Sequence, residues 1–130
     1  MRRGGFFIRI NLLRRQLELY QGGTLYNSYL IAIGKPSTPS PVGRWSITNK
    51  TILTGGTVYG TRWMGLSLDR YGIHGNNNPR VIGQAVSLGC IRMFNEDIET
   101  IFPIIPLHTQ VEIISGSRGS GYPPPPYHPK

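Results

Sequence analysis

The sequence predicts a mainly β domain, either a β-sandwich or a partly closed barrel, with one short helix. Three observations lead to this fold class. Apolar and polar residues alternate in several short runs, which is the pattern of half-buried strands. Glycine and proline, 17 and 11 of the 130 residues, separate these runs. A single stretch has the features of a helix. With 38% hydrophobic and 15% charged residues, the chain can bury the core of one domain.

The first third of the chain has the pattern of a β-meander. Apolar side chains alternate with polar ones on both sides of a Gly-Gly turn at 22–23, and these are Phe6, Ile8, Ile10, Leu17, Leu19 and Leu25. A further strand is expected over 26–34, where the apolar run is continuous enough to be buried on both faces near its end. Three prolines in residues 35–42 then predict an extended loop, because proline fixes φ and removes a ladder donor.

The remainder predicts further strands and the helix. Strands are expected over 43–49, 61–68, 71–74 and 109–115, with a polar, glycine-broken stretch over 50–60 and a loop over 76–86. The helix is expected to begin at Asn95 as its N-cap, with Glu96, Asp97 and Glu99 near its positive end, and to stop at Pro103. The strand count is seven or eight.

Residues 1–115 are therefore expected to form one domain, and 116–130 a tail that is flexible and then polyproline II. That tail is either without a role or a ligand for a proline-binding module. No run of about 18 uncharged apolar residues is present, so no transmembrane helix is expected. The apolar residues at 6–8 are interrupted by Arg9, so the N-terminus does not have the pattern of a signal peptide.

The net charge of +8 predicts an anionic partner. Nucleic acid, anionic lipid and acidic cell-wall polymers all satisfy that requirement, although the scattered bases and the absence of a known module argue against nucleic acid. Carboxylate-pair chemistry is disfavoured, since Asp69 is the only acid between Glu18 and Glu96.

Cys90 and His74 are the residues best suited to chemistry. Cys90 is the only cysteine and follows Gly89, which allows close approach of a bound group; a buried, inert thiol is the alternative. His74 has the position of a strand-end base for that thiol, or of a half-buried histidine without a role. Metal is disfavoured because His108 is the one other ligand in the body, and no cofactor is expected.

Several linked motifs resemble the L,D-transpeptidase catalytic domain, the YkuD-like family. They are YGIHGNNNP over 71–79, IG at 82–83 and SLGCIRM over 87–93 with Asn95 and Asp97. The match extends to AIGKPSTPSPVG over 32–43, YGTRWM over 59–64 and LHTQV over 107–111. The resemblance covers residues 6–115, and the order of its motifs makes it specific.

The resemblance implies a cysteine acyltransferase. Cys90 would be the nucleophile that forms a thioester with a peptidoglycan stem tetrapeptide and releases D-alanine, and His74 the base, oriented by the Gly75 carbonyl. The N–H groups of Gly89 and Cys90 would form the oxyanion hole. Substrate contacts are expected from Arg92, Tyr59, Trp63, Asn76 and Ser87. For Tyr59, Trp63 and Trp45, packing in the core is as good an interpretation. Arg92 is alternatively a structural residue or a positive charge that favours thiolate. An acceptor amine would then resolve the thioester into a cross-link.

The resemblance also implies a cellular location and a class of covalent inhibitor. It implies a role in cell-wall biogenesis and cell shape, an extracytoplasmic or cell-wall location with spore association as one option, and acylation by carbapenems. A monomer is expected. One departure is Leu88, where the commonest family motif has histidine. Two other functions stay open from the residues: a catalytically weak or silent wall-binding module, and a cysteine carboxypeptidase or amidase with water as acceptor.

Overall fold

The computed structural model describes residues 5–116 and contains nine strands and one α-helix within them. The strands are β1 (Phe6–Asn11), β2 (Gln16–Gln21), β3 (Thr24–Gly34), β4 (Gly43–Ile52), β5 (Arg62–Leu66), β6 (Gly72–His74), β7 (Ala85–Ser87), β8 (Ile91–Met93) and β9 (Gln110–Ile114). The helix α1 spans Asn95–Ile101, and a short 3-10 helix spans Pro79–Val81.

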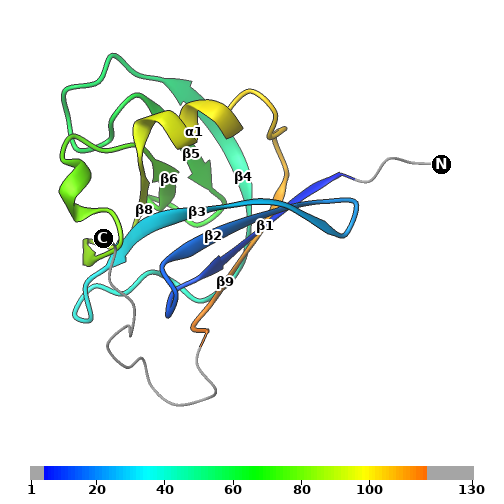
Figure 1. Cartoon of the computed structure of the whole chain (residues 1–130), viewed down its shortest axis with the longest axis horizontal. Coiled ribbons are helices and arrows are strands. Elements are labelled where there is room, and N and C mark those ends of the chain that lie inside the picture. Colours follow the sequence, from blue (N-terminus) through cyan, green and yellow to red (C-terminus); the bar gives the residue numbers. More distant parts are fainter. Residues whose placement is uncertain (1–4, 117–130) are drawn as a thin grey trace.

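Eight of the strands form a closed barrel, so the barrel alternative of the predicted fold class is confirmed (Figure 1). The strand order is β2, β1, β9, β4, β5, β6, β8 and β3, and the ring closes because β2 also pairs with β3. β7 lies outside the ring and pairs in parallel with the end of β3. Closure pairs the backbone N–H and C=O groups that the edge strands of an open sheet would leave exposed.

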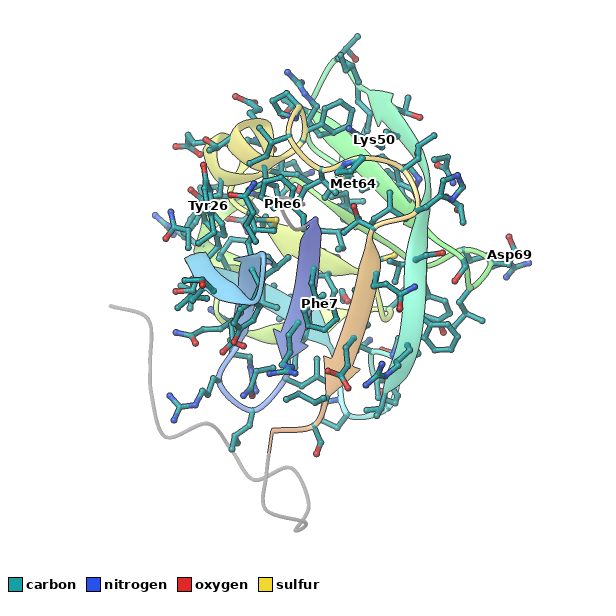
Figure 2. All side chains as sticks on the ribbon, turned by 90° about the vertical axis from the view of Figure 1, so that its right-hand side faces the viewer. Phe6, Phe7, Tyr26, Lys50, Met64 and Asp69 are labelled. Atoms are coloured by element: carbon teal, nitrogen blue, oxygen red, sulfur yellow. The ribbon has the colours of Figure 1, made fainter. Side chains whose placement is uncertain are left out.

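The predicted alternation fills the barrel. Inward-facing aliphatic side chains of β1, β2 and β9 are fully or almost fully buried, and these are Ile8, Ile10, Leu17, Leu19, Val111 and Ile113. Met64 of β5 lies inside, whereas Asp69 in the turn after β5 projects into solvent (Figure 2). α1 covers one end of the barrel and buries Ile98 and Ile101 in the same core (Figure 1).

The element boundaries differ from prediction where pairing partners are remote. β4 continues to Ile52 instead of ending at 49, because its last residues pair with β5. Leu25 is 52% exposed, because a register irregularity after Leu19 pairs it with Tyr20. Its side chain therefore lies outside the core. β7 and β8 were not predicted: each has three residues, too few to show a period.

The helix has its predicted length and place, but the prediction that Asn95 is its N-cap is wrong. Phe94 occupies the N-cap without a side-chain hydrogen bond, and Asn95 is the first helical residue. The Asn95 side chain bonds the backbone of Asn76 instead. The predicted tail, beyond 116, lies outside the described residues. No helix within 5–116 is long and apolar enough to cross a membrane.

Candidate active site

Cys90 lies directly before β8, level with Gly72 at the start of β6. The parallel pairing of β6 with β8 matches Ile73 with Ile91 and His74 with Arg92. Continued by one residue, this register puts Cys90 opposite Gly72, whose N–H hydrogen-bonds the cysteine sulfur. The thiol also donates to the Arg70 carbonyl, with Sγ and O 3.5 Å apart. The thiol is thus held between two backbone groups of the β5–β6 connection.

His74 ends β6 on the outer face of the barrel and is 2% exposed. Alternate residues of a strand face the same side, so His74, its partner Arg92 and Cys90 share this face. Two aromatic rings cover the imidazole: Trp63 is stacked with it at 5.6 Å between centroids and Tyr59 meets it edge-on at 4.9 Å. Its Nδ1 lies 2.8 Å from the Gly75 carbonyl oxygen.

That contact determines the tautomer of His74. A carbonyl oxygen only accepts, so Nδ1 carries the proton and donates it, which leaves Nε2 as the basic nitrogen. The pKa of His74 is lowered to about 4: burial is the largest cause and the nearby Arg92 charge adds to it, while the Gly75 and Val58 carbonyls act in the opposite direction. The imidazole is therefore neutral near pH 7 and able to accept a proton.

The thiol is protonated at rest for a similar reason. Burial raises the pKa of Cys90 above its usual value of 9.0, although the Gly72 N–H and the positive charge of Arg92 oppose this. A protonated thiol and a neutral imidazole form no ion pair. In these protonation states the thiol holds a proton and the imidazole has one basic nitrogen.

Cys90 opens onto a cavity of about 710 Å³ beside the β5–β6 turn. Its walls are mostly apolar and aromatic, and they are formed by Thr51, Leu53, Tyr59, Trp63, Arg70, Tyr71, Leu88 and Cys90. His74 lies behind the two rings that cover it, outside these walls. Cys90 is therefore reached from the cavity, whereas His74 is buried.

The structure places the predicted substrate contacts in two groups. Tyr59 and Trp63 line the cavity. Asn76 and Ser87 are buried outside it, where Asn76 Nδ2 donates to the Met93 carbonyl and Ser87 Oγ donates to the Cys90 carbonyl. Through these bonds both residues support the backbone on either side of β8. That they contact the substrate stays a prediction.

Arg92 and the predicted oxyanion hole also have defined surroundings. Arg92 is half-buried and does not line the cavity, and its Nε has no hydrogen-bond partner within 5–116. The Gly89 N–H donates to Ser87 Oγ at 3.0 Å. The hydrogen bonds found in residues 5–116 include none from the Cys90 N–H.

Sequence reasoning missed Arg70 and Tyr71, which line the cavity with Cys90. The family motif starts at Tyr71, but nothing in it indicates a role for that ring, which packs over Gly89. Arg70 has φ +76°, a left-handed conformation uncommon for arginine, and its carbonyl meets the thiol. No sequence pattern predicts that conformation.

No group of three or more His, Cys, Asp or Glu side chains within residues 5–116 is placed to hold a metal ion.

The YkuD profile, described as the L,D-transpeptidase catalytic domain, matches residues 5–113. The chain belongs to this family. It is 45% identical over 106 residues to the YkuD protein of Bacillus licheniformis, which is named as an L,D-transpeptidase. The match covers 82% of this chain and 64% of that relative, so the chain spans less than two thirds of the relative's length.

Solved structures share the fold. An L,D-transpeptidase in complex with imipenem has a TM-score of 0.74 at 15% identity, with 85% of this chain and 59% of that chain covered. L,D-transpeptidase 3 of Mycobacterium tuberculosis, in complex with a faropenem-derived adduct, has a TM-score of 0.73 at 15% identity, with 85% and 60% covered. The barrel described above is thus the fold of L,D-transpeptidase catalytic domains.

Proposed function

We propose that this protein is a peptidoglycan L,D-transpeptidase that works through a thioester at Cys90. The observation that carries the proposal is an accessible thiol and a buried, neutral imidazole on neighbouring strands of one sheet face. Cys90 lines the cavity, His74 lies on the neighbouring strand of the same face, and the Gly75 carbonyl fixes the tautomer of His74. Membership of the family supplies the substrate class.

The first half-reaction forms the acyl-enzyme. Cys90 Sγ attacks the carbonyl carbon of the bond between the diamino acid and the terminal D-alanine of a stem tetrapeptide. Nε2 of His74 takes the thiol proton and returns it to the leaving nitrogen as the C–N bond breaks. D-Alanine leaves, and the thioester remains.

The second half-reaction transfers the acyl group. An amine of a neighbouring stem attacks the thioester carbonyl, His74 removes its proton, and the C–S bond breaks to give the cross-link. The proton returns to sulfur. In both halves the Cys90 N–H is the oxyanion donor available in this geometry, because the Gly89 N–H is bonded to Ser87 Oγ.

Arg70 is the side chain that we assign to the substrate carboxylate. It is exposed on the cavity wall, and the ion pairs found within residues 5–116 do not involve it. A guanidinium presents a donor fork that matches a carboxylate. Arg92, which does not line the cavity, acts through its charge, which favours thiolate and disfavours imidazolium. Tyr59 and Trp63 contact the apolar part of the donor.

The proposed place of action is the cell wall outside the cytoplasmic membrane, where peptidoglycan is found. The net charge of +8 suits attraction to anionic wall polymers. This attraction would concentrate the protein at its substrate without contributing to the chemical step.

Intact mass after incubation with imipenem tests the proposal. Imipenem is chosen because a solved L,D-transpeptidase of this fold was captured with it. One covalent adduct is expected on the parent protein and none on Cys90→Ala. Circular dichroism of both proteins controls for folding. A folded parent that stays unmodified, or an adduct that persists in Cys90→Ala, would contradict a Cys90 thioester.

A second assay identifies the acceptor. The parent and Cys90→Ala are incubated with a stem tetrapeptide, with and without an added amine. Transpeptidation predicts D-alanine release accompanied by a cross-linked product that increases with amine concentration. Release with free tripeptide as the only other product would indicate water as the acceptor, and hence a carboxypeptidase.

A further inference from the structure

The proline-containing loop over residues 35–42 packs against the segment that carries Cys90. Thr38 Oγ1 and the Lys35 N–H both donate to the Ser87 carbonyl, at 2.8 and 3.0 Å. Ser40 Oγ donates to the Gly89 carbonyl at 2.8 Å. Segments almost fifty residues apart in the chain are therefore joined by hydrogen bonds directly beside the nucleophile.

Ser40 is the most constrained of these groups. It is 3% exposed, and its Oγ also accepts the Gly34 N–H at 3.0 Å. A hydroxyl has a single proton, and Ser40 donates its proton to the Gly89 carbonyl. The loop is turned tightly over Gly34, where an added Cβ would lie 2.8 Å from the Ser40 nitrogen and 2.9 Å from the Pro39 carbonyl carbon. Ser40 thus has little room to move away.

The bond from Ser40 sets the direction of the Gly89–Cys90 peptide group. The described chain contains no cis peptide bond, and in a trans peptide the C=O and the following N–H point in opposite directions. With its carbonyl turned to Ser40, this group directs the Cys90 N–H away from Ser40. Gly89 has φ +128°, and glycine is the residue least able to resist rotation of an adjacent peptide group.

We propose that Ser40 is a positioning residue that holds the Gly89–Cys90 peptide with its N–H directed at the reacting carbonyl. The inference rests on the proposed function, because only acyl transfer needs an oxyanion donor. Without the hydroxyl, the peptide can turn and present a carbonyl oxygen where negative charge develops. Ser40 touches no substrate; it acts through the backbone of the nucleophile.

Two reactions of the same thiol separate this role from a merely structural one. Acylation by imipenem passes through an oxyanion, whereas alkylation by iodoacetamide is a displacement at carbon that forms none. Both rates are measured at one pH for the parent, Ser40→Ala, Ser40→Thr and Thr38→Val. Thr38→Val is the matched control, since it removes a hydroxyl from the same loop that bonds Ser87 instead of the Gly89–Cys90 peptide.

Ser40→Ala is expected to slow acylation by ~10- to 100-fold, somewhat less than outright removal of an oxyanion donor, with alkylation changed by less than about twofold. Ser40→Thr, which keeps the hydroxyl, restores most of the acylation rate, and Thr38→Val changes neither rate. The role proposed for Ser40 is overturned if Ser40→Ala is acylated as fast as the parent, or if its acylation and alkylation rates fall equally. Either result leaves the proposed function standing. A parent that is alkylated but never acylated overturns the proposed function, and this inference with it.

Discussion

The two reactive residues are positioned by different means. His74 is part of the barrel: it pairs with Trp63 on one side and Arg92 on the other, and a backbone carbonyl one residue away orients its ring. Cys90 precedes its strand and depends on hydrogen bonds from side chains, because Ser40 holds Gly89 and Ser87 holds Cys90. His74 is thus fixed by main-chain pairing, whereas the backbone around Cys90 is held by hydroxyl groups and only its sulfur contacts main-chain groups.

This difference matches what each residue has to do. A buried base keeps a low pKa and stays neutral, and 2% exposure gives His74 that environment. A nucleophile must meet a large substrate, so it lies on a cavity wall and outside the regular ladder. Substitutions around His74 and substitutions around Cys90 should therefore slow acylation for different physical reasons.

Loss of the base should have the largest effect. His74→Gln keeps a planar polar side chain but cannot accept the thiol proton, so acylation by imipenem at pH 7 is expected to fall by ~10²- to 10⁴-fold. Time-resolved intact mass measures the rate, and circular dichroism confirms the fold. A variant that is acylated as fast as the parent would remove His74 from the mechanism.

Asn95→Ala tests the main-chain positioning of the histidine side. Asn95 Oδ1 accepts the Asn76 N–H at 3.1 Å and its Nδ2 donates to the Asn76 carbonyl at 3.0 Å, directly after the carbonyl that orients His74. Its removal leaves two partly buried backbone groups unpaired. Urea denaturation should show a loss of about 1–3 kcal/mol.

The same variant should acylate more slowly than the parent but faster than His74→Gln, because the base remains and only its support is weakened. The exposed Asn77 supplies a nearby control, and Asn77→Ala should change neither stability nor rate. Unchanged stability in Asn95→Ala would show that the ladder alone positions His74.

Leu88→His should have the smallest effect. Leu88 is 75% exposed and lines the cavity, and the hydrogen bond of the thiol goes to Arg70 and not to Leu88. A histidine there changes contacts with the substrate, and kcat/KM for a tetrapeptide donor is expected to change by less than about tenfold. An increase of several orders of magnitude would mean that the natural leucine impairs the site.

The sequence predicted the parts of the fold that repeat a local pattern. Ile8, Ile10, Leu17 and Leu19 show the period of two and face the core. β7 and β8 are defined by pairing with residues more than fifteen positions away, which no local window detects. Asn95 has the residue type of an N-cap, yet its side chain bonds Asn76, a tertiary contact that overrides the local preference.

For the site, the linked motifs indicated Cys90, His74 and Gly75, because their residue types and order are specific. Burial was the missing information. Ser87 is 1% exposed and braces the Cys90 segment, and the cavity is lined by Arg70 and not by Arg92. The roles of Ser40 and Arg70 depend on one hydroxyl contact and one left-handed backbone conformation, and neither is written in a residue pattern.

The central claim is that a protonated thiol stands beside a neutral imidazole. The ultraviolet absorbance of thiolate, recorded from pH 5 to 8 with Cys90→Ala as the blank, tests it most directly. Since the pKa of Cys90 is raised above 9.0 and that of His74 is lowered to about 4, the parent should show almost no thiolate absorbance at pH 5 and only a small rise by pH 8. A full thiolate signal at pH 5 that stays constant to pH 8 would reveal a thiolate–imidazolium pair and contradict the account.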